Sequence, residues 1–247
     1  MLIAAAALLV SVLAWAYLVR IDARMPTGHA SAQAMAGMVM VARAAWRPAD
    51  FMLTFTMWAV MMVGMMGPSA TPMLLFAASH ARHANRRAST AVAPFALGYL
   101  TMWFGFSAGA TLLQWLLSQA LLVSNAMAVS NPRLAGALLV AAGIYQLTPT
   151  KRACLAHCET PIGFLMHHWR DGSGGAYRMG VRHGVYCVGC CWALMLVLFV
   201  VGVMNLAWVA GLTVFILAER LGRLGAFVSR AGGLTLITLG VLLATRL

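Results

Sequence analysis

Acidic residues are scarce in this chain of 247 residues. Only five Asp and Glu residues face 17 Lys and Arg residues, and none of the five lies deep within an apolar stretch. A proton relay built on membrane carboxylates is therefore not expected. The chain also lacks an ATPase motif, a GxGxxG motif and a carboxylate pair spaced for hydrolysis. The sequence thus favours a non-enzymatic role.

Charged residues of both signs are few as well. They make up 9% of the chain, whereas 62% is hydrophobic and the mean hydropathy is +0.86. Soluble domains usually carry about 25% charged residues, so the composition predicts a polytopic membrane protein. The net charge of +12 comes from Arg residues that flank apolar segments, which is typical of topology determinants. We expect the lipid bilayer as a partner, and no nucleic acid.

Seven apolar segments approach the roughly 20 residues that cross a bilayer. They are residues 2–19, 51–78, 94–123, 134–148, 184–204, 206–218 and 231–244. The sequence predicts an all-α fold, a polytopic transmembrane helix bundle with about seven (six to seven) spans, in a single integral membrane domain over residues 1–247. The second segment carries Pro68 and Pro72, so we expect it to kink or break there.

Basic residues predict the orientation of the bundle. The loops at 80–93, 149–183 and 219–230 hold several Arg residues each, and the loops between them hold one or none. We expect the basic loops to be cytoplasmic, with the N-terminus inside and the C-terminus outside a bacterial-type inner (plasma) membrane. Four Arg residues between the first two segments oppose this alternation, and we give the later loops more weight.

Cysteine is absent from residues 1–153 and 192–247, and all five cysteines lie between these limits. They are Cys154, Cys158, Cys187, Cys190 and Cys191. Stable disulfides are disfavoured in a reducing cytoplasm, so clustered thiols predict a metal site or a dithiol redox centre. A lone membrane cysteine is usually a small apolar filler, but five in one window fit that interpretation badly.

The second cysteine group follows a helical spacing. His183, Cys187, Cys191 and Met195 are four residues apart and share a face if the fifth span begins near His183. This stripe drifts by about 40° per step, so two or three of these residues are expected to face one ion, and Cys190 can join them. A CxxC pair at a helix N-terminus is also a redox geometry.

The first cysteine group, in the cytoplasmic Cys/His-containing loop 149–183, predicts a short interfacial helix between Pro149 and Pro161. Two cysteine pairs brought together supply four sulfurs, which suits Zn(II), whereas fewer sulfurs with Met or His suit Cu(I). The candidate metal ligands are Cys154, Cys158, Cys187, Cys190, Cys191, His157, His183 and His168. No catalytic residue is predicted.

Methionine is abundant, with 18 residues. Met57, Met61 and Met65 fall on one face of the second span, with Met62 and Met66 on the adjacent face. A ladder of thioethers can pass Cu(I), but Met also packs irregular helix surfaces. We favour packing.

Several short strings within residues 51–223 form a specific combination. They are Trp58-x-x-Met61, Met65-Met66-x-Pro68, Tyr145-Gln146-x-Thr148-Pro149-x-Lys151, Cys154-Leu155-x-x-Cys158, His168-Trp169-Arg170-x-Gly172 and His183-Gly184-x-Tyr186-Cys187-x-Gly189-Cys190-Cys191-Trp192. On these strings the chain resembles the predicted metal-binding integral membrane protein family, the domain of unknown function 2182. The resemblance implies metal binding but names neither the metal nor the direction of transfer. Glu159 stands where a basic residue would be expected.

The leading hypothesis is a membrane metal-binding protein that handles a soft transition metal, copper first and zinc second, through a Cys/His cluster at the cytoplasmic face. Its partner would be a metallochaperone or a membrane complex. One alternative is a membrane thiol-disulfide oxidoreductase that works through Cys187, Cys190 and one of the first two cysteines. Another is an accessory structural subunit of a membrane complex.

Overall fold

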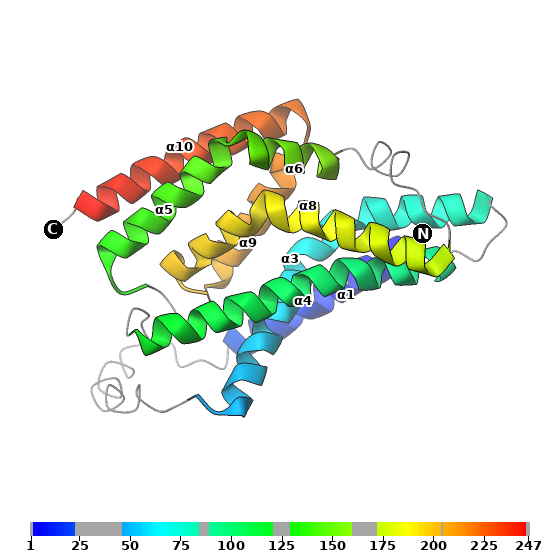
Figure 1. Cartoon of the computed structure of the whole chain (residues 1–247), viewed down its shortest axis with the longest axis horizontal. Coiled ribbons are helices and arrows are strands. Elements are labelled where there is room, and N and C mark those ends of the chain that lie inside the picture. Colours follow the sequence, from blue (N-terminus) through cyan, green and yellow to red (C-terminus); the bar gives the residue numbers. More distant parts are fainter. Residues whose placement is uncertain are drawn as a thin grey trace.

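The computed structural model describes residues 2–22, 46–83, 89–120, 129–159, 172–203 and 205–245. Within these ranges the chain forms eight helices, and the expected all-α fold is confirmed (Figure 1). The helices are α1 (Leu2–Asp22), α3 (Pro48–His83), α4 (Ser89–Gln119), α5 (Pro132–Leu147), α6 (Pro149–Glu159), α8 (Gly172–Val201), α9 (Leu206–Glu219) and α10 (Arg223–Thr245).

Five of these helices, α1, α3, α4, α8 and α10, are long and apolar enough to cross a membrane, two fewer than expected. The other two expected spans, α5 and α9, are apolar helices of 16 and 14 residues. At 1.5 Å per residue they extend about 24 and 21 Å, against a hydrocarbon core of about 30 Å. Capping residues limit the length of both helices. Asn131 and Asn205 accept hydrogen bonds at the N-termini of α5 and α9, and Thr148 is the C-cap of α5.

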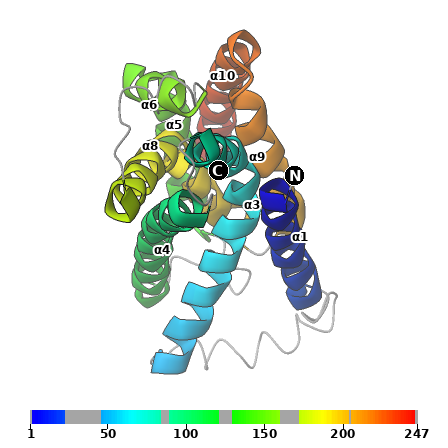
Figure 2. The same ribbon diagram turned by 90° about the vertical axis from the view of Figure 1, so that its right-hand side faces the viewer.

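Glycines bring two helix pairs into close contact. A Cβ on Gly98 of α4 would overlap the backbone of Tyr177 in α8, and a Cβ on Gly180 of α8 would overlap the backbone of Phe95 in α4. Gly136 of α5 meets the backbone of Gly240 in α10 in the same way. Such small residues let helices approach closely inside a membrane. Figure 2 shows α6 beside α5 and α8, across the bundle from α1.

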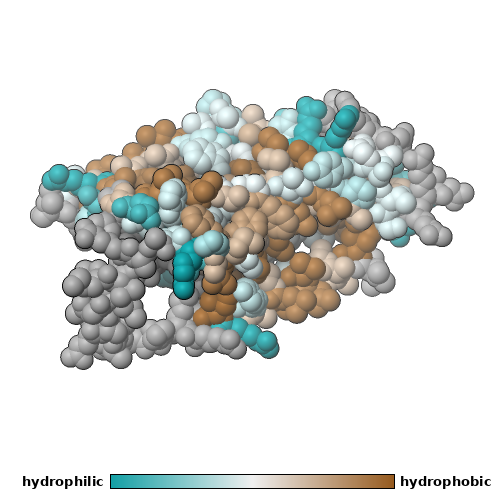
Figure 3. Space-filling model, turned by 60° about the horizontal axis from the view of Figure 1, so that its bottom comes forward, coloured by the Kyte–Doolittle hydropathy of each residue, from teal (hydrophilic) through white to brown (hydrophobic). Residues whose placement is uncertain are grey.

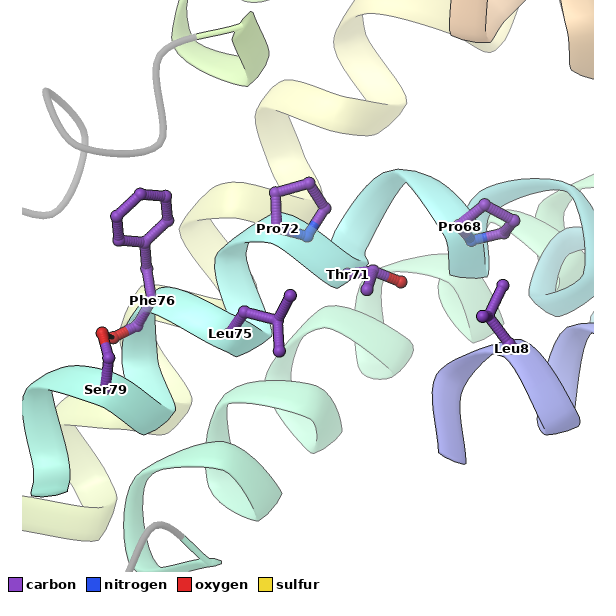
Figure 4. Close-up of a pocket in the computed structure, with 7 residues that line it drawn as sticks. All are labelled: Leu8, Pro68, Thr71, Pro72, Leu75, Phe76 and Ser79. Carbon is purple, nitrogen blue, oxygen red and sulfur yellow. Dashed lines mark hydrogen bonds between the residues drawn. The ribbon is translucent and has the colours of Figure 1, made fainter. Parts of the chain in front are cut away.

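The second apolar segment stays one helix, α3, through both of its prolines. The helix bends along its course, as Figure 1 shows, so the expected kink is present and the alternative of a break is wrong. Pro68 and Pro72 border an open groove of about 630 Å³ that Leu8 of α1 and Phe76 of α3 also line (Figure 4).

Much of the surface is hydrophobic, as expected for helices that face lipid. Figure 3 shows large hydrophobic areas between hydrophilic patches. Large apolar side chains such as Leu53, Val214 and Phe227 are about two-thirds exposed, at 69%, 67% and 68%. Apolar surface on this scale is unusual for a soluble monomer.

The segment expected to be a loop, residues 149–183, contains helix at both of its described ends. Pro149 opens α6, where a short helix was predicted, and α8 begins at Gly172, about three turns before the expected start. The early start is stabilised by packing, because Ala176, Met179 and Gly180 are buried one helical turn apart. As a result, the second cysteine group lies about midway along α8.

Candidate metal centre

Four thiols from two helices meet inside the bundle. Cys158 of α6 is 7% exposed, and Cys187, Cys190 and Cys191 of α8 are 0%, 2% and 0% exposed. All four belong to the same hydrophobic core, and the Cys158 thiol interacts with Cys187 and Cys190. All are free cysteines. We call these four residues the thiol cluster.

Helical spacing explains how α6 and α8 present these thiols. Leu155 and Cys158, three residues apart, form the buried face of α6. Gly189 of α8 leaves room for α6, because a Cβ there would lie 3.0 Å from the Sγ atom of Cys154. Tyr145 of α5 donates a hydrogen bond of 2.5 Å from its OH to the Gly189 carbonyl, which ties α5 to the same turn of α8.

Cys154, the fifth cysteine, is only partly buried and lies at the edge of the thiol cluster. Burial, and to a lesser degree the nearby Cys190, raise the pKa of the Cys154 thiol. Hydrogen bonds with Cys187 and Cys190, together with burial, raise the pKa of Cys158 well above its usual value. Binding of a metal by these residues would therefore release protons.

Cys187 lies where four parts of the fold converge. Its Sγ atom is 3.1 Å from Nη2 of Arg220, in the turn between α9 and α10, and 3.2 Å from the hydroxyl of Tyr99 in α4. Arg220 also donates to the carbonyl of Ser69 in α3 at 3.2 Å. A guanidinium in this position offsets negative charge on the sulfur. The sequence did not predict this contact.

Glu219 does not form an ion pair with its neighbour Arg220. Its Oε1 atom lies 2.6 Å from Nζ of Lys151 and accepts a hydrogen bond of 2.8 Å from Nε2 of Gln146. Lys151 also donates to the side-chain oxygen of Gln146. Lys151 and Glu219 are 0% and 1% exposed. This buried network joins α5, α6 and α9.

The predicted histidine ligands have aromatic neighbours. His157 stacks on Tyr186 with ring centroids 4.2 Å apart, and its Nδ1 atom lies 2.7 Å from the carbonyl oxygen of Ala153. His183 lies against the ring of Tyr99, 5.7 Å between centroids, one turn before Cys187. His168 falls outside the described residues. The structure thus brings four of the eight predicted ligands into one cluster, and ligation by the histidines stays a prediction.

Buried methionines belong to the same core as the thiols. Met61, Met62, Met65 and Met66 of α3 and Met195 of α8 are each at most 1% exposed, and all belong to the hydrophobic core that contains the thiol cluster. Their burial agrees with a packing role, which is the interpretation that the sequence favoured.

The cysteine side chains point partly back onto their own helix. Cys190 and Cys191 donate from Sγ to the carbonyl of Cys187 at 3.1 and 3.0 Å. Among the described residues, no three His, Cys, Asp or Glu side chains are arranged so that they could hold a metal ion. Ligation by Cys190 or Cys191 would need the thiol to rotate away from this carbonyl to another rotamer.

The chemistry of the donors still fits a soft cation. Thiolates and thioethers favour Cu(I), and carboxylates, which favour harder ions, are not part of the thiol cluster. The redox interpretation loses one of its supports, because Cys187 lies near the middle of α8, where the N-terminal dipole of a helix no longer acts on a thiol.

Comparison with known proteins identifies a copper-related family. A family model described as "PpoB2: Copper chaperone" matches residues 55–243. No curated protein and no solved structure matches the chain. The match supports the copper part of the copper-or-zinc expectation and does not itself support the name of the family that the sequence resembles. Since it covers most of the chain, the protein belongs to the PpoB2 copper-chaperone family.

Proposed function

We propose that this protein is a multi-pass membrane copper handler, which binds one Cu(I) ion in the thiol cluster and passes it to a partner protein. The observation that carries the proposal is the convergence of Cys158 with Cys187, Cys190 and Cys191 in a buried core, all as free thiols. The copper-chaperone family match agrees with this chemistry. Copper is the cargo here, not a permanent cofactor.

In the proposed membrane arrangement, α5 and α9 cross together with the five long helices and complete a bundle of seven in a single integral domain. The termini lie at opposite ends of the bundle (Figure 1), as an odd number of crossings requires. The short helices can be accommodated by local thinning of the bilayer. We place the basic segments, and with them α6, on the cytoplasmic side of an inner membrane.

Cys154 is the cysteine beside the thiol cluster that solvent can reach. It is partly buried, whereas the cluster thiols are at most 7% exposed. An ion that enters or leaves by ligand exchange would therefore meet Cys154 before the buried sulfurs. Thiol-to-thiol exchange suits Cu(I), because this ion accepts low coordination numbers and soft ligands.

Elemental analysis of the detergent-purified, reduced protein tests the proposal. After loading with Cu(I), the wild type should retain about one copper per chain, and a variant with all five cysteines replaced by Ser should retain none. Met61→Leu is the matched control, because it changes a buried sulfur outside the thiol cluster. Absence of copper from loaded wild-type protein would overturn the proposal.

A further inference from the structure

Arg220 is a cation without a carboxylate partner in the described part of the chain. The ion pairs found there join Arg47 to Asp50 and Lys151 to Glu219. The Nε atom of Arg220 is buried and has no hydrogen-bond partner, while Nη1 and Nη2 reach Ser69 O and Cys187 Sγ. Arg220 as a whole is half-buried, and a guanidinium shielded from solvent is costly unless a negative charge balances it.

Lys151 keeps the nearest acid away from Arg220. Glu219 precedes Arg220 in the chain, but its carboxylate points into the network with Lys151 and Gln146. The group left to balance the Arg220 charge is the sulfur of Cys187, 3.1 Å away. The fold thus places one positive charge, the guanidinium of Arg220, beside the thiol cluster.

The charge of the bound ion then decides whether the charges of the ion, its thiolate ligands and Arg220 sum to zero. Each thiol that becomes a ligand loses its proton to solvent. Cu(I) between two thiolates forms a complex with one net negative charge, which the Arg220 guanidinium neutralises. A divalent ion between the same two thiolates forms a neutral complex, so the charge of the half-buried guanidinium stays unbalanced.

We infer that Arg220 is a specificity-determining residue that makes the thiol cluster select a monovalent soft ion, held by two thiolates, over divalent ions. The inference rests on the proposed function, since it assigns the charge of the ion that the same cluster binds. Tyr99, whose hydroxyl lies 3.2 Å from the Cys187 sulfur, carries no charge, so it should contribute little to this selectivity.

Competition titrations on the reduced full-length protein in detergent test the inference. Affinities for Cu(I) and Zn(II) are measured with a chelator for each ion, in the wild type, Arg220→Gln, Arg220→Lys and Tyr99→Phe. We expect Arg220→Gln to weaken Cu(I) binding by about tenfold or more, as loss of a nearby charge predicts, and to leave Zn(II) binding unchanged or stronger. Arg220→Lys and Tyr99→Phe should keep the wild-type ratio of the two affinities.

The outcomes separate the two proposals. If the wild type binds no Cu(I), the proposed function fails and the inference fails with it. If the wild type binds Cu(I) but Arg220→Gln weakens the binding of both ions equally, or of neither, only the inference is overturned. An equal loss of affinity would indicate that zinc is held by three thiolates, in a complex with the same net charge as Cu(I) held by two. Arg220→Leu, which also removes the charge, replaces Arg220→Gln if that variant does not purify as a folded protein.

Discussion

Lys151 and Glu219 form an ion pair, 2.6 Å from Nζ to Oε1, although they are 68 residues apart and neither side chain is more than 2% exposed. The pair fixes the start of α6 to the end of α9. Because α6 carries Cys158, the position of this thiol depends on the pair. The pair also holds Glu219 away from Arg220, so Arg220 reaches Cys187 without forming an ion pair with Glu219.

Lys151→Met should destabilise the protein strongly, because it leaves Glu219 buried without its cation. Removing one partner of a buried ion pair typically costs about 3–5 kcal/mol, so we expect a clear drop in the thermal midpoint measured in detergent. The double variant Lys151→Met with Glu219→Gln should regain part of this loss, since it removes both charges.

Arg152→Gln is the control for this prediction. Arg152 is the exposed neighbour of Lys151 and donates to the carbonyl of Leu147. Surface substitutions usually change stability by about 0.5 kcal/mol or less. An equal drop for Arg152→Gln and Lys151→Met would show that the buried pair has no special role.

Cys187→Ser and Cys191→Ser should each lower the copper retained per chain, whereas Met61→Leu should change it little. Both cysteines are fully buried members of the thiol cluster, and Ser supplies a hard oxygen in place of a soft sulfur. Metal content after Cu(I) loading and desalting measures the effect. Equal losses in all three variants would show that the methionines of α3 are ligands and not packing residues.

Local patterns predicted the parts of the site that depend on local structure. The window that holds all five cysteines, the short helix that opens at Pro149 and the shared face of Cys187 and Cys191 follow from composition and helical spacing. The length of α8 was underestimated, because its first turns look polar and become helical through close packing on α4 at Gly98 and Gly180.

The partners of the charged residues could not be predicted in this way. Glu219 and Arg220 are adjacent in the chain, and adjacency alone favours a local ion pair. In the folded protein Glu219 instead contacts Lys151, and Arg220 contacts Cys187. A fully buried Lys requires an acidic partner, but the sequence does not show that Lys151 is buried, and only the structure reveals it.

A redox role makes a different prediction from a copper-binding role. An oxidoreductase that works through Cys187 and Cys190 should accumulate a mixed disulfide when its resolving cysteine is replaced by Ser. We expect no such adduct in any single Cys→Ser variant, because the structure places the thiols in a closed core and away from a helix N-terminus. Mass spectrometry after acid quenching of membranes detects the adduct, and its appearance in one variant would favour the oxidoreductase.

Gly98→Ala should destabilise the contact between α4 and α8, because its Cβ would overlap the backbone of Tyr177 and Val181. Overpacking of this kind costs about 1–3 kcal/mol. Gly105→Ala in the same helix is the matched control, since nothing lies within 4 Å of a Cβ there; it should leave stability unchanged or raise it, as Ala is a better helix former than Gly. Thermal midpoints in detergent compare the two. Equal midpoints would contradict the close approach of α4 and α8, which brings Tyr99 to Cys187 and so completes the surroundings of the thiol cluster.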